Sequence, residues 1–150
     1  DRLINPPVSG LPAFLVSNPG VNSGMMIVQY VAASLCGQNR QLAQPAVLDN
    51  FVTSGLQEDH LSMGTNAALK LHAVLDNVTQ ILAIEYLLAA QAFEFLKEQR
   101  FGAGTHTAWC LLREQVPAYE QDRWLAPDIA TAATLLKNTD LLNHALPNVH

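Results

Sequence analysis

The side chains best suited to chemistry are gathered in one short stretch, QEDH, which runs from Gln57 through Glu58 and Asp59 to His60. An amide, two carboxylates and an imidazole can exchange protons or bind a polar ligand, so the stretch is a candidate binding or acid–base site. A second interpretation competes with the first. A long apolar run follows, and acidic residues at a helix start are stabilised by the helix dipole. On pattern alone, the helix-start interpretation of Glu58 and Asp59 is the default.

A metal site is not expected. Glu58, Asp59 and His60 are adjacent, and adjacent side chains point in different directions on a helix or a strand, so they cannot all ligate one ion. The other histidines show no HxxxH or ExxH pairing: His72, His106, His144 and His150. Cys36 and Cys110 lack CxxC spacing and a placed base, so we expect two unpaired thiols in a reduced, cytoplasmic setting.

The composition indicates one domain with an unusually apolar surface. The chain has 150 residues, of which 49% are hydrophobic and 14% charged, where an average soluble protein has about 25% charged. This deficit suggests that part of the surface is hidden in an interface. The net charge of −5 and the lack of a basic run argue against a nucleic-acid partner. The start, DRLINPPVSG, has neither the features of a signal peptide nor an initiating Met, so we expect a piece of a longer polypeptide.

The elements that must position the QEDH stretch are predicted to be helices. Residues 1–22 contain four prolines and are typical of an extended lead-in. An apolar pattern predicts a helix over 23–44, capped by Ser23, buried on nearly every side at its start and stopped by Pro45. Residues 45–61 form the loop that carries the candidate site. No segment shows convincing strand alternation, so the predicted fold class is all-α.

The longest predicted element is a helix over 62–99. Apolar residues recur in it at steps of three or four, the spacing of one helix face: Ala67, Leu71, Val74, Val78, Ile81, Ile84, Leu88, Ala92 and Phe95. Such a helix would be roughly 57 Å long, whereas a compact domain of this size is about 40 Å across. We therefore expect a long-helix bundle that forms part of a larger, mainly helical subunit. Glu85 and Gln91 interrupt the most apolar run, which argues against a membrane span.

Residues 100–150 are predicted to form the C-terminal helices. They comprise a helix over 105–115 capped by Thr105, a last helix from Pro127 to about Lys137, and a short turn around 140–144.

Two pairs of residues outside the QEDH stretch have simple structural interpretations. Asp122 and Arg123 are most simply a surface pair or a cap, and Met25 and Met26 are most simply core filler.

Five segments of the chain occur in the order and approximate spacing found in the histidine ammonia-lyases, which belong to the aromatic amino acid ammonia-lyases: SGLPAFL, NSGMMI, QEDHLSMG, REQVP and DRWLAPDI. The chain resembles the last third of such an enzyme. The resemblance implies a helical homotetramer, an amino acid substrate and a methylidene-imidazolone group cyclised from an internal Ala-Ser-Gly. This chain has no Ala-Ser-Gly. The group and the tyrosine base would lie in the rest of the polypeptide, so the chain alone is expected to be inactive.

The resemblance also implies roles for individual residues. Glu58 matches the family's active-site glutamate and is the expected catalytic residue, while Met26, Ser54 and Gln57 match substrate-pocket positions. The phenylalanine lyases of plants carry Lys, Glu and Gln at the positions of Met26, Ser54 and Glu58. The pocket is therefore similar to the histidine type, which implies loss of ammonia from L-histidine to give urocanate.

Two departures and two alternatives accompany this interpretation. Leu56 stands where the histidine lyases usually have Asn, and Met25 where Phe is common. Tyrosine or phenylalanine lyases and aminomutases of the same family share much of the QEDH motif. A different class also stays open, a non-catalytic helical oligomerisation module in which the apolar stripe is the entire function.

Overall fold

The protein is helical, as predicted. The computed structural model describes residues 1–150 except 49, 97–101, 139–142, 144 and 146–150. Its elements are, in chain order, α1 (Pro6–Ser9), η1 (Ala13–Leu15), α2 (Met26–Leu42), η2 (Ala46–Leu48), α3 (Gly64–Phe93), α4 (Ala103–Arg113) and α5 (Ala126–Lys137). Within the described residues, the only β pairing consists of two isolated bridges.

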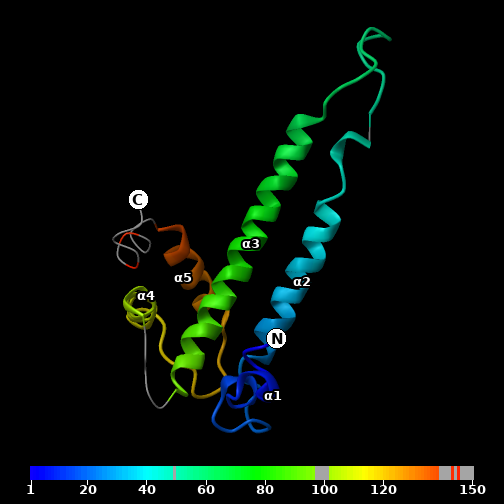
Figure 1. The fold of residues 1–150 in the computed structure, drawn as a ribbon. Helices are drawn as coiled ribbons and strands as arrows, with labels where there is room; N and C mark the ends of the chain where they lie inside the picture. The colour runs from blue at the N-terminus through cyan, green and yellow to red at the C-terminus, as the bar shows by residue number, and fades with distance from the viewer. Residues whose placement is uncertain (49, 97–101, 139–142, 144, 146–150) are drawn as a thin grey trace.

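Two long helices form an extended hairpin (Figure 1). Helices α2 and α3 lie side by side, and the loop between them stands far from the N-terminus, while α5 packs on α3 nearer the other end. A polar contact joins the hairpin near its middle. The buried amide of Asn77 donates to Gln38 Oε1 over 2.9 Å and to Asn39 Oδ1 over 2.8 Å. Because a buried amide without partners is costly, these bonds help to set the register of α2 on α3.

Helix α3 is shorter than the predicted 62–99. It has 30 residues and a length of about 45 Å. Its start is delayed to Gly64 because Met63 has a left-handed φ of 52°, and a turn at Glu94 and Phe95 follows its end. Residues 97–99 of the prediction lie outside the described residues.

The apolar stripe of α3 is covered in one half only. Ile84 and Leu88 are buried, whereas Leu71 is 58% exposed and Val78 is 37% exposed. The described part of this chain therefore leaves the loop-side half of α3 without a cover, which agrees with a helix made for a larger bundle.

By length and composition alone, α3 is also apolar enough to cross a membrane, with 33% of its most apolar window buried in this chain. A core helix of a soluble protein meets the same test. The buried Gln91 on this helix bonds to protein groups, as expected for a helix that packs in a protein interior.

The prediction of an extended lead-in over 1–22 is wrong. The segment folds into α1, η1 and turns, and Ile4, Leu15 and Val16 are buried with exposures of 3% or less. Two physical reasons explain the difference. Proline suits the first turn of a helix, where Pro6 stands, and Ile4 and Leu15 pack in one cluster with Ile84 and Leu88 of α3.

The predicted helix caps are also wrong. Ser23 lies in a turn three residues before α2 begins, and Thr105 lies inside α4, whose cap position is Gly102. The start of α2 is not buried on every side, since Ile27 is 55% exposed and Tyr30 is 67% exposed. Helix α5 places its proline and Asp128 in the first turn, as predicted. Of the predicted turn at 140–144, only residue 143 is described.

Candidate active-site loop and its supporting junction

The QEDH stretch lies in the loop that joins α2 to α3, here called the tip loop (residues 50–61). Thr53 and Glu58 pair as an antiparallel bridge: the Thr53 N–H donates to the Glu58 carbonyl over 2.8 Å, and the reverse bond measures 3.3 Å. Between them, Ser54, Gly55 and Leu56 have φ values of 53°, 64° and 71°. Three consecutive left-handed residues turn the chain back on itself, so Glu58 is presented by a tight loop.

This geometry removes the helix-start interpretation of Glu58 and Asp59. Helix α3 begins at Gly64, six residues after Glu58, and its first turn contains no acidic residue. The dipole effect fades within the first turn of a helix. The carboxylate of Glu58 instead accepts a 3.4 Å hydrogen bond from the Thr53 hydroxyl and is otherwise open to solvent.

A residue that the sequence did not single out, Asn50, ties the two arms of the tip loop together. Its Oδ1 accepts the Leu61 N–H over 3.1 Å, its amide donates to the Leu61 carbonyl, and His60 Nδ1 lies 3.4 Å from the same amide. His60 therefore contacts Asn50, the residue that closes the tip loop. An Asn shortly before a polar loop was the only sequence signal for this role.

The four predicted site residues do not converge within one chain. Ser54, Gln57 and Glu58 share the tip loop, where the Gln57 N–H donates to the Ser54 carbonyl over 3.3 Å. Met26 is the first residue of α2, at the opposite end of a 17-residue helix. That helix separates its ends by about 24 Å, so Met26 is remote from the other three.

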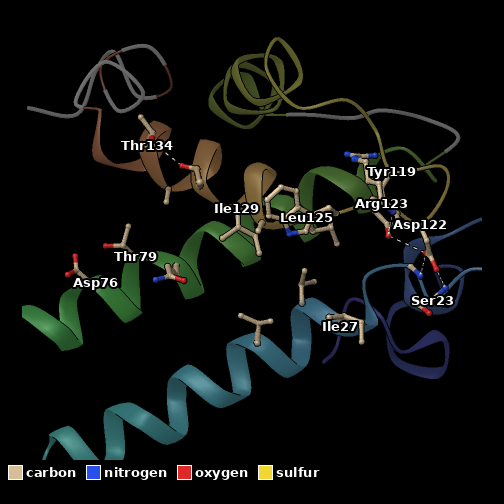
Figure 2. A pocket seen from close by; sticks show the side chains of 18 of the residues that line it. Ser23, Ile27, Asp76, Thr79, Tyr119, Asp122, Arg123, Leu125, Ile129 and Thr134 are labelled. Atoms are coloured by element: carbon tan, nitrogen blue, oxygen red, sulfur yellow. Dashed lines mark hydrogen bonds between the residues drawn. The ribbon is translucent and has the colours of Figure 1, made fainter.

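Met26 belongs to a turn at the other end of the hairpin, held by a set of contacts called here the base junction (Ser23–Met26, Gln91, Tyr119 and Asp122). The Met26 N–H donates to the Ser23 carbonyl over 3.3 Å, and the Met25 N–H donates to the Phe14 carbonyl over 2.8 Å. Asp122 accepts the two remaining N–H groups, from Ser23 over 2.8 Å and from Gly24 over 3.0 Å (Figure 2).

These bonds change the acidity of Asp122. Hydrogen bonds from the Ser23 and Gly24 backbone, and further from the Tyr119 hydroxyl, stabilise the carboxylate and lower the pKa of Asp122 from its ordinary value of 3.8. Asp122 thus holds the turn before α2, and it neither pairs with Arg123 nor caps that helix, so neither interpretation from the sequence describes it.

Gly24 is required in this turn by its conformation and its surroundings. Its φ is 58°, and a Cβ placed there would lie 2.5 Å from the Phe14 carbonyl oxygen. No side chain fits at that distance. The NSG motif is therefore a structural signature of close backbone approach.

Gln91 of α3 is the buried member of the base junction, and its exposure is 2%. Its amide nitrogen donates to the carbonyls of Leu15 over 3.2 Å and Tyr119 over 2.9 Å, and its oxygen accepts the Tyr119 N–H over 2.9 Å. One side chain thereby joins the lead-in, α3 and the segment before α5. From the sequence, Gln91 was interpreted only as an interruption in an apolar run.

The other half of the predicted pair, Arg123, bonds elsewhere than to Asp122. Its guanidinium contacts Asp128 at 2.7 Å, donates to the carbonyls of Pro117 and Ala118, and lies 4.9 Å from the centre of the Tyr119 ring. Arg123 therefore ties the segment before α5 to the first turn of that helix.

A cavity of about 930 Å³ lies between α2, α3 and α5. The residues that line it include the apolar Ile27, Val31, Trp124 and Ile129 and the charged Asp76 and Lys137 (Figure 2 labels Ile27, Ile129 and Asp76). None of the four predicted site residues lines it.

In the described part of the chain, no three His, Cys, Asp or Glu side chains gather in a way that could hold a metal ion. Cys36 and Cys110 are both free thiols.

Comparison with known proteins places the chain in a family. The family model described as aromatic amino acid lyase matches residues 1–114. A histidine ammonia-lyase from Symbiobacterium thermophilum is 51% identical over 95% of this chain, which spans 28% of that relative's length.

Solved structures agree with this placement. The crystal structure of histidine ammonia-lyase from Trypanosoma cruzi matches 99% of this chain with a TM-score of 0.93 and 41% identity, and the chain covers 29% of it. Tyrosine aminomutase from Streptomyces globisporus matches 99% with a TM-score of 0.91 and 33% identity, and the chain again covers 29% of it. The chain belongs to the aromatic amino acid lyase family.

Proposed function

We propose that this chain is the C-terminal part of a histidine ammonia-lyase that converts L-histidine to urocanate and ammonia. The observation that carries the proposal is the tip loop, which holds Glu58 outside any helix and exposes its carboxylate. Such a carboxylate is free to contact a ligand supplied from outside this chain. The 51% identity to a relative named histidine ammonia-lyase supports the choice of substrate.

The electrophile of the reaction would come from outside this chain. The chain's three Ser-Gly pairs follow Val8, Asn22 and Thr53, and their glycines serve turns with φ values of 70°, 58° and 64°. None forms an Ala-Ser-Gly. The methylidene-imidazolone group, when present, supplies an electrophile that activates the amino acid for loss of ammonia.

The tip loop would supply binding and charge. The Glu58 carboxylate would accept a hydrogen bond from the imidazole or the ammonium of histidine, and a charge-assisted bond of this kind is about twice as strong as a neutral one. Ser54 and Gln57 lie in the same loop and would line the pocket beside it.

The distance between Met26 and Glu58 supports an oligomer. Because α2 separates them, both can face one substrate only if they come from different copies of the chain, arranged so that the base of one hairpin meets the tip of another. We propose a homotetramer, in which the exposed stripe of Leu71, Leu75, Val78 and Leu82 on α3 is covered. The free thiols suit a reducing cytoplasmic setting.

The runner-up is another activity of the same family. The tyrosine aminomutase of Streptomyces globisporus has nearly the same TM-score as the lyase from Trypanosoma cruzi, so the fold does not discriminate between them. A non-catalytic oligomerisation module is less well supported, because Glu58 does not serve a helix start.

The test of the proposal is Glu58→Gln in the complete polypeptide, with urocanate formation and the unfolding midpoint measured on the same preparations. The change removes the charge and keeps the size. Loss of a charge-assisted contact of about 1.5–3 kcal/mol would lower kcat/KM roughly 10-fold to 150-fold. The unfolding midpoint should stay close to wild type, since the side chain is exposed. Unaltered histidine turnover in a folded Glu58→Gln variant would remove Glu58 from the site.

A control and a companion variant sharpen this test. Asp59→Asn removes a neighbouring exposed carboxylate and should change kcat/KM much less than Glu58→Gln does. Met26→Lys combined with Ser54→Glu introduces the phenylalanine-type pair and should lower histidine turnover. Faster turnover of tyrosine than of histidine by the unaltered enzyme would favour the runner-up.

A further inference from the structure

In the base junction, Met26 is bonded through its backbone N–H to its own turn. Ser23 and Met26 close a four-residue turn with Gly24 and Met25 at its centre, and the 3.3 Å bond from the Met26 N–H to the Ser23 carbonyl sets where α2 begins. No side chain caps α2. The direction of the first helical residue therefore depends on the position of the Ser23 and Gly24 peptides.

Both of those peptides are held by one side chain from a distant part of the sequence. Asp122 Oδ2 accepts the Ser23 N–H over 2.8 Å, and Asp122 Oδ1 accepts the Gly24 N–H over 3.0 Å. In return, the Asp122 N–H donates to Asn22 Oδ1 over 3.3 Å. The two segments, whose bonded residues are 98 and 99 positions apart in the sequence, are thus joined both through the Asp122 carboxylate and through its backbone N–H.

Asp122 is itself held in place. The Tyr119 hydroxyl donates to Asp122 Oδ1 over 3.2 Å, and the Tyr119 backbone is bonded on both its N–H and its carbonyl to the buried Gln91. A rigid path therefore runs from the interior of α3 through Tyr119 and Asp122 to the turn before Met26. The turn also packs closely on Phe14, since a Cβ added at Gly24 would lie 2.5 Å from the Phe14 carbonyl oxygen.

We propose that Asp122 is a positioning residue for the substrate pocket: its carboxylate fixes the Ser23–Gly24 turn and so fixes Met26 where it meets the substrate. The inference rests on the proposed function, because it takes Met26 as a pocket residue. It assigns Asp122 no contact with the substrate and no part in the chemistry.

The experiment is a double-mutant cycle in the complete enzyme with Asp122→Asn and Met26→Ala, read as kcat and KM for L-histidine. The amide of Asn can accept only one of the two backbone bonds. Asp122→Asn should raise KM roughly tenfold with kcat less affected, since displacement of a positioned group by 1 Å can cost on the order of 100-fold. In the Met26→Ala background the same change should raise KM less than about twofold, because coupled residues are not additive.

The matched control is Asp128→Asn. Asp128 pairs with Arg123 in the same segment but does not touch the turn, so this variant lowers stability without raising KM. Equal effects of Asp122→Asn in both backgrounds, or a fall in kcat with unchanged KM, would mean that Asp122 only stabilises the fold, and the proposal would be overturned.

A second measurement is independent of activity. Hydrogen exchange over residues 22–26, followed by mass spectrometry, should be faster in Asp122→Asn than in Asp128→Asn. Unchanged protection in Asp122→Asn would show that Asp122 does not hold the turn, and this conclusion would not depend on which substrate the enzyme uses. Faster exchange in an enzyme that does not use histidine would show that Asp122 holds the turn. It would count only against the proposed function.

Discussion

The tip loop and the base junction are both rich in polar groups, yet they use them in opposite ways. In the base junction, Gln91 is buried and its amide is bonded on both sides to backbone groups. In the tip loop, Gln57, Glu58, Asp59 and His60 are all exposed. Polar groups bonded within the chain serve the fold, and polar groups left open to solvent in a closed loop are available to a ligand.

The same division runs through the five family segments. SGLPAFL, NSGMMI, REQVP and DRWLAPDI meet near the base junction, where their contacts are internal, while QEDHLSMG alone stands at the tip. Family resemblance therefore rests on two kinds of residue. Most of the matching sequence maintains the base, QEDHLSMG carries Gln57 and Glu58, and NSGMMI carries the expected pocket residue Met26.

The comparison predicts the largest loss of stability at Gln91. Gln91→Leu leaves the Leu15 carbonyl and both backbone groups of Tyr119 without partners and should lower the free energy of unfolding of the complete protein by about 2–4 kcal/mol. Gln57→Leu, in the exposed tip loop, should change it by less than about 0.5 kcal/mol. Urea unfolding of both variants checks this, and similar losses at the two sites would show that the bonds of the buried Gln91 do not stabilise the fold.

Two glycines offer a matched pair of smaller effects. Gly24 and Gly55 have similar φ values of 58° and 64°, but a Cβ at Gly24 meets Phe14 at 2.5 Å whereas one at Gly55 meets nothing within 4 Å. Gly55→Ala should cost about 1 kcal/mol of left-handed strain. Gly24→Ala should cost roughly 2–3 kcal/mol, because the clash adds to the strain. The order of the two unfolding midpoints is the measurement, and equal midpoints would contradict the crowding at Gly24.

Relief of strain should make one tip-loop change stabilising. Leu56 has a φ of 71° and is 85% exposed, and Asn tolerates this conformation much better than Leu. Leu56→Asn should therefore raise the free energy of unfolding by up to about 1 kcal/mol. Leu69→Asn, at an exposed position inside α3, should lower it slightly through helix propensity. A loss at both positions would show that Leu56 is not strained.

The smallest predicted effect is one of pH at the base junction. Hydrogen bonds from Ser23 and Gly24 lower the pKa of Asp122 below 3.8, so its contribution to stability is present above that value and is lost as the pH falls through the lower, folded-state pKa. The difference in unfolding midpoint between the wild type and Asp122→Asn should be constant above about pH 5 and should shrink at lower pH. A gap that widens in acid would mean that the carboxylate is not held by these bonds.

Several features followed from the sequence because they depend on local pattern. Spacing of three and four residues predicted the long helix that became α3, and proline and Asp128 predicted the start of α5. The low charge fraction suggested surface hidden in an interface, which agrees with the apolar side chains left exposed on α3. The family was recognisable from five short motifs, since motifs are linear. The same pattern could not place α3's first residue, because the left-handed φ of Met63 is not visible in residue types.

Tertiary structure alone decided what each motif residue does. The backbone partners of Gln91 lie 28 and 76 residues away, and the Ser23 and Gly24 partners of Asp122 lie 99 and 98 residues away. No periodicity in the sequence can report contacts at such separations. The fold of residues 1–22 was missed for the same reason, since its apolar side chains are buried only where α3 receives them. The predicted helix over 23–44 already implied that Met26 and Glu58 are apart, and the structure adds that α2 lies along α3, so that the loop after α2 stands far from the start of that helix. Local pattern determined which elements form, and contacts between distant segments determined how they are held.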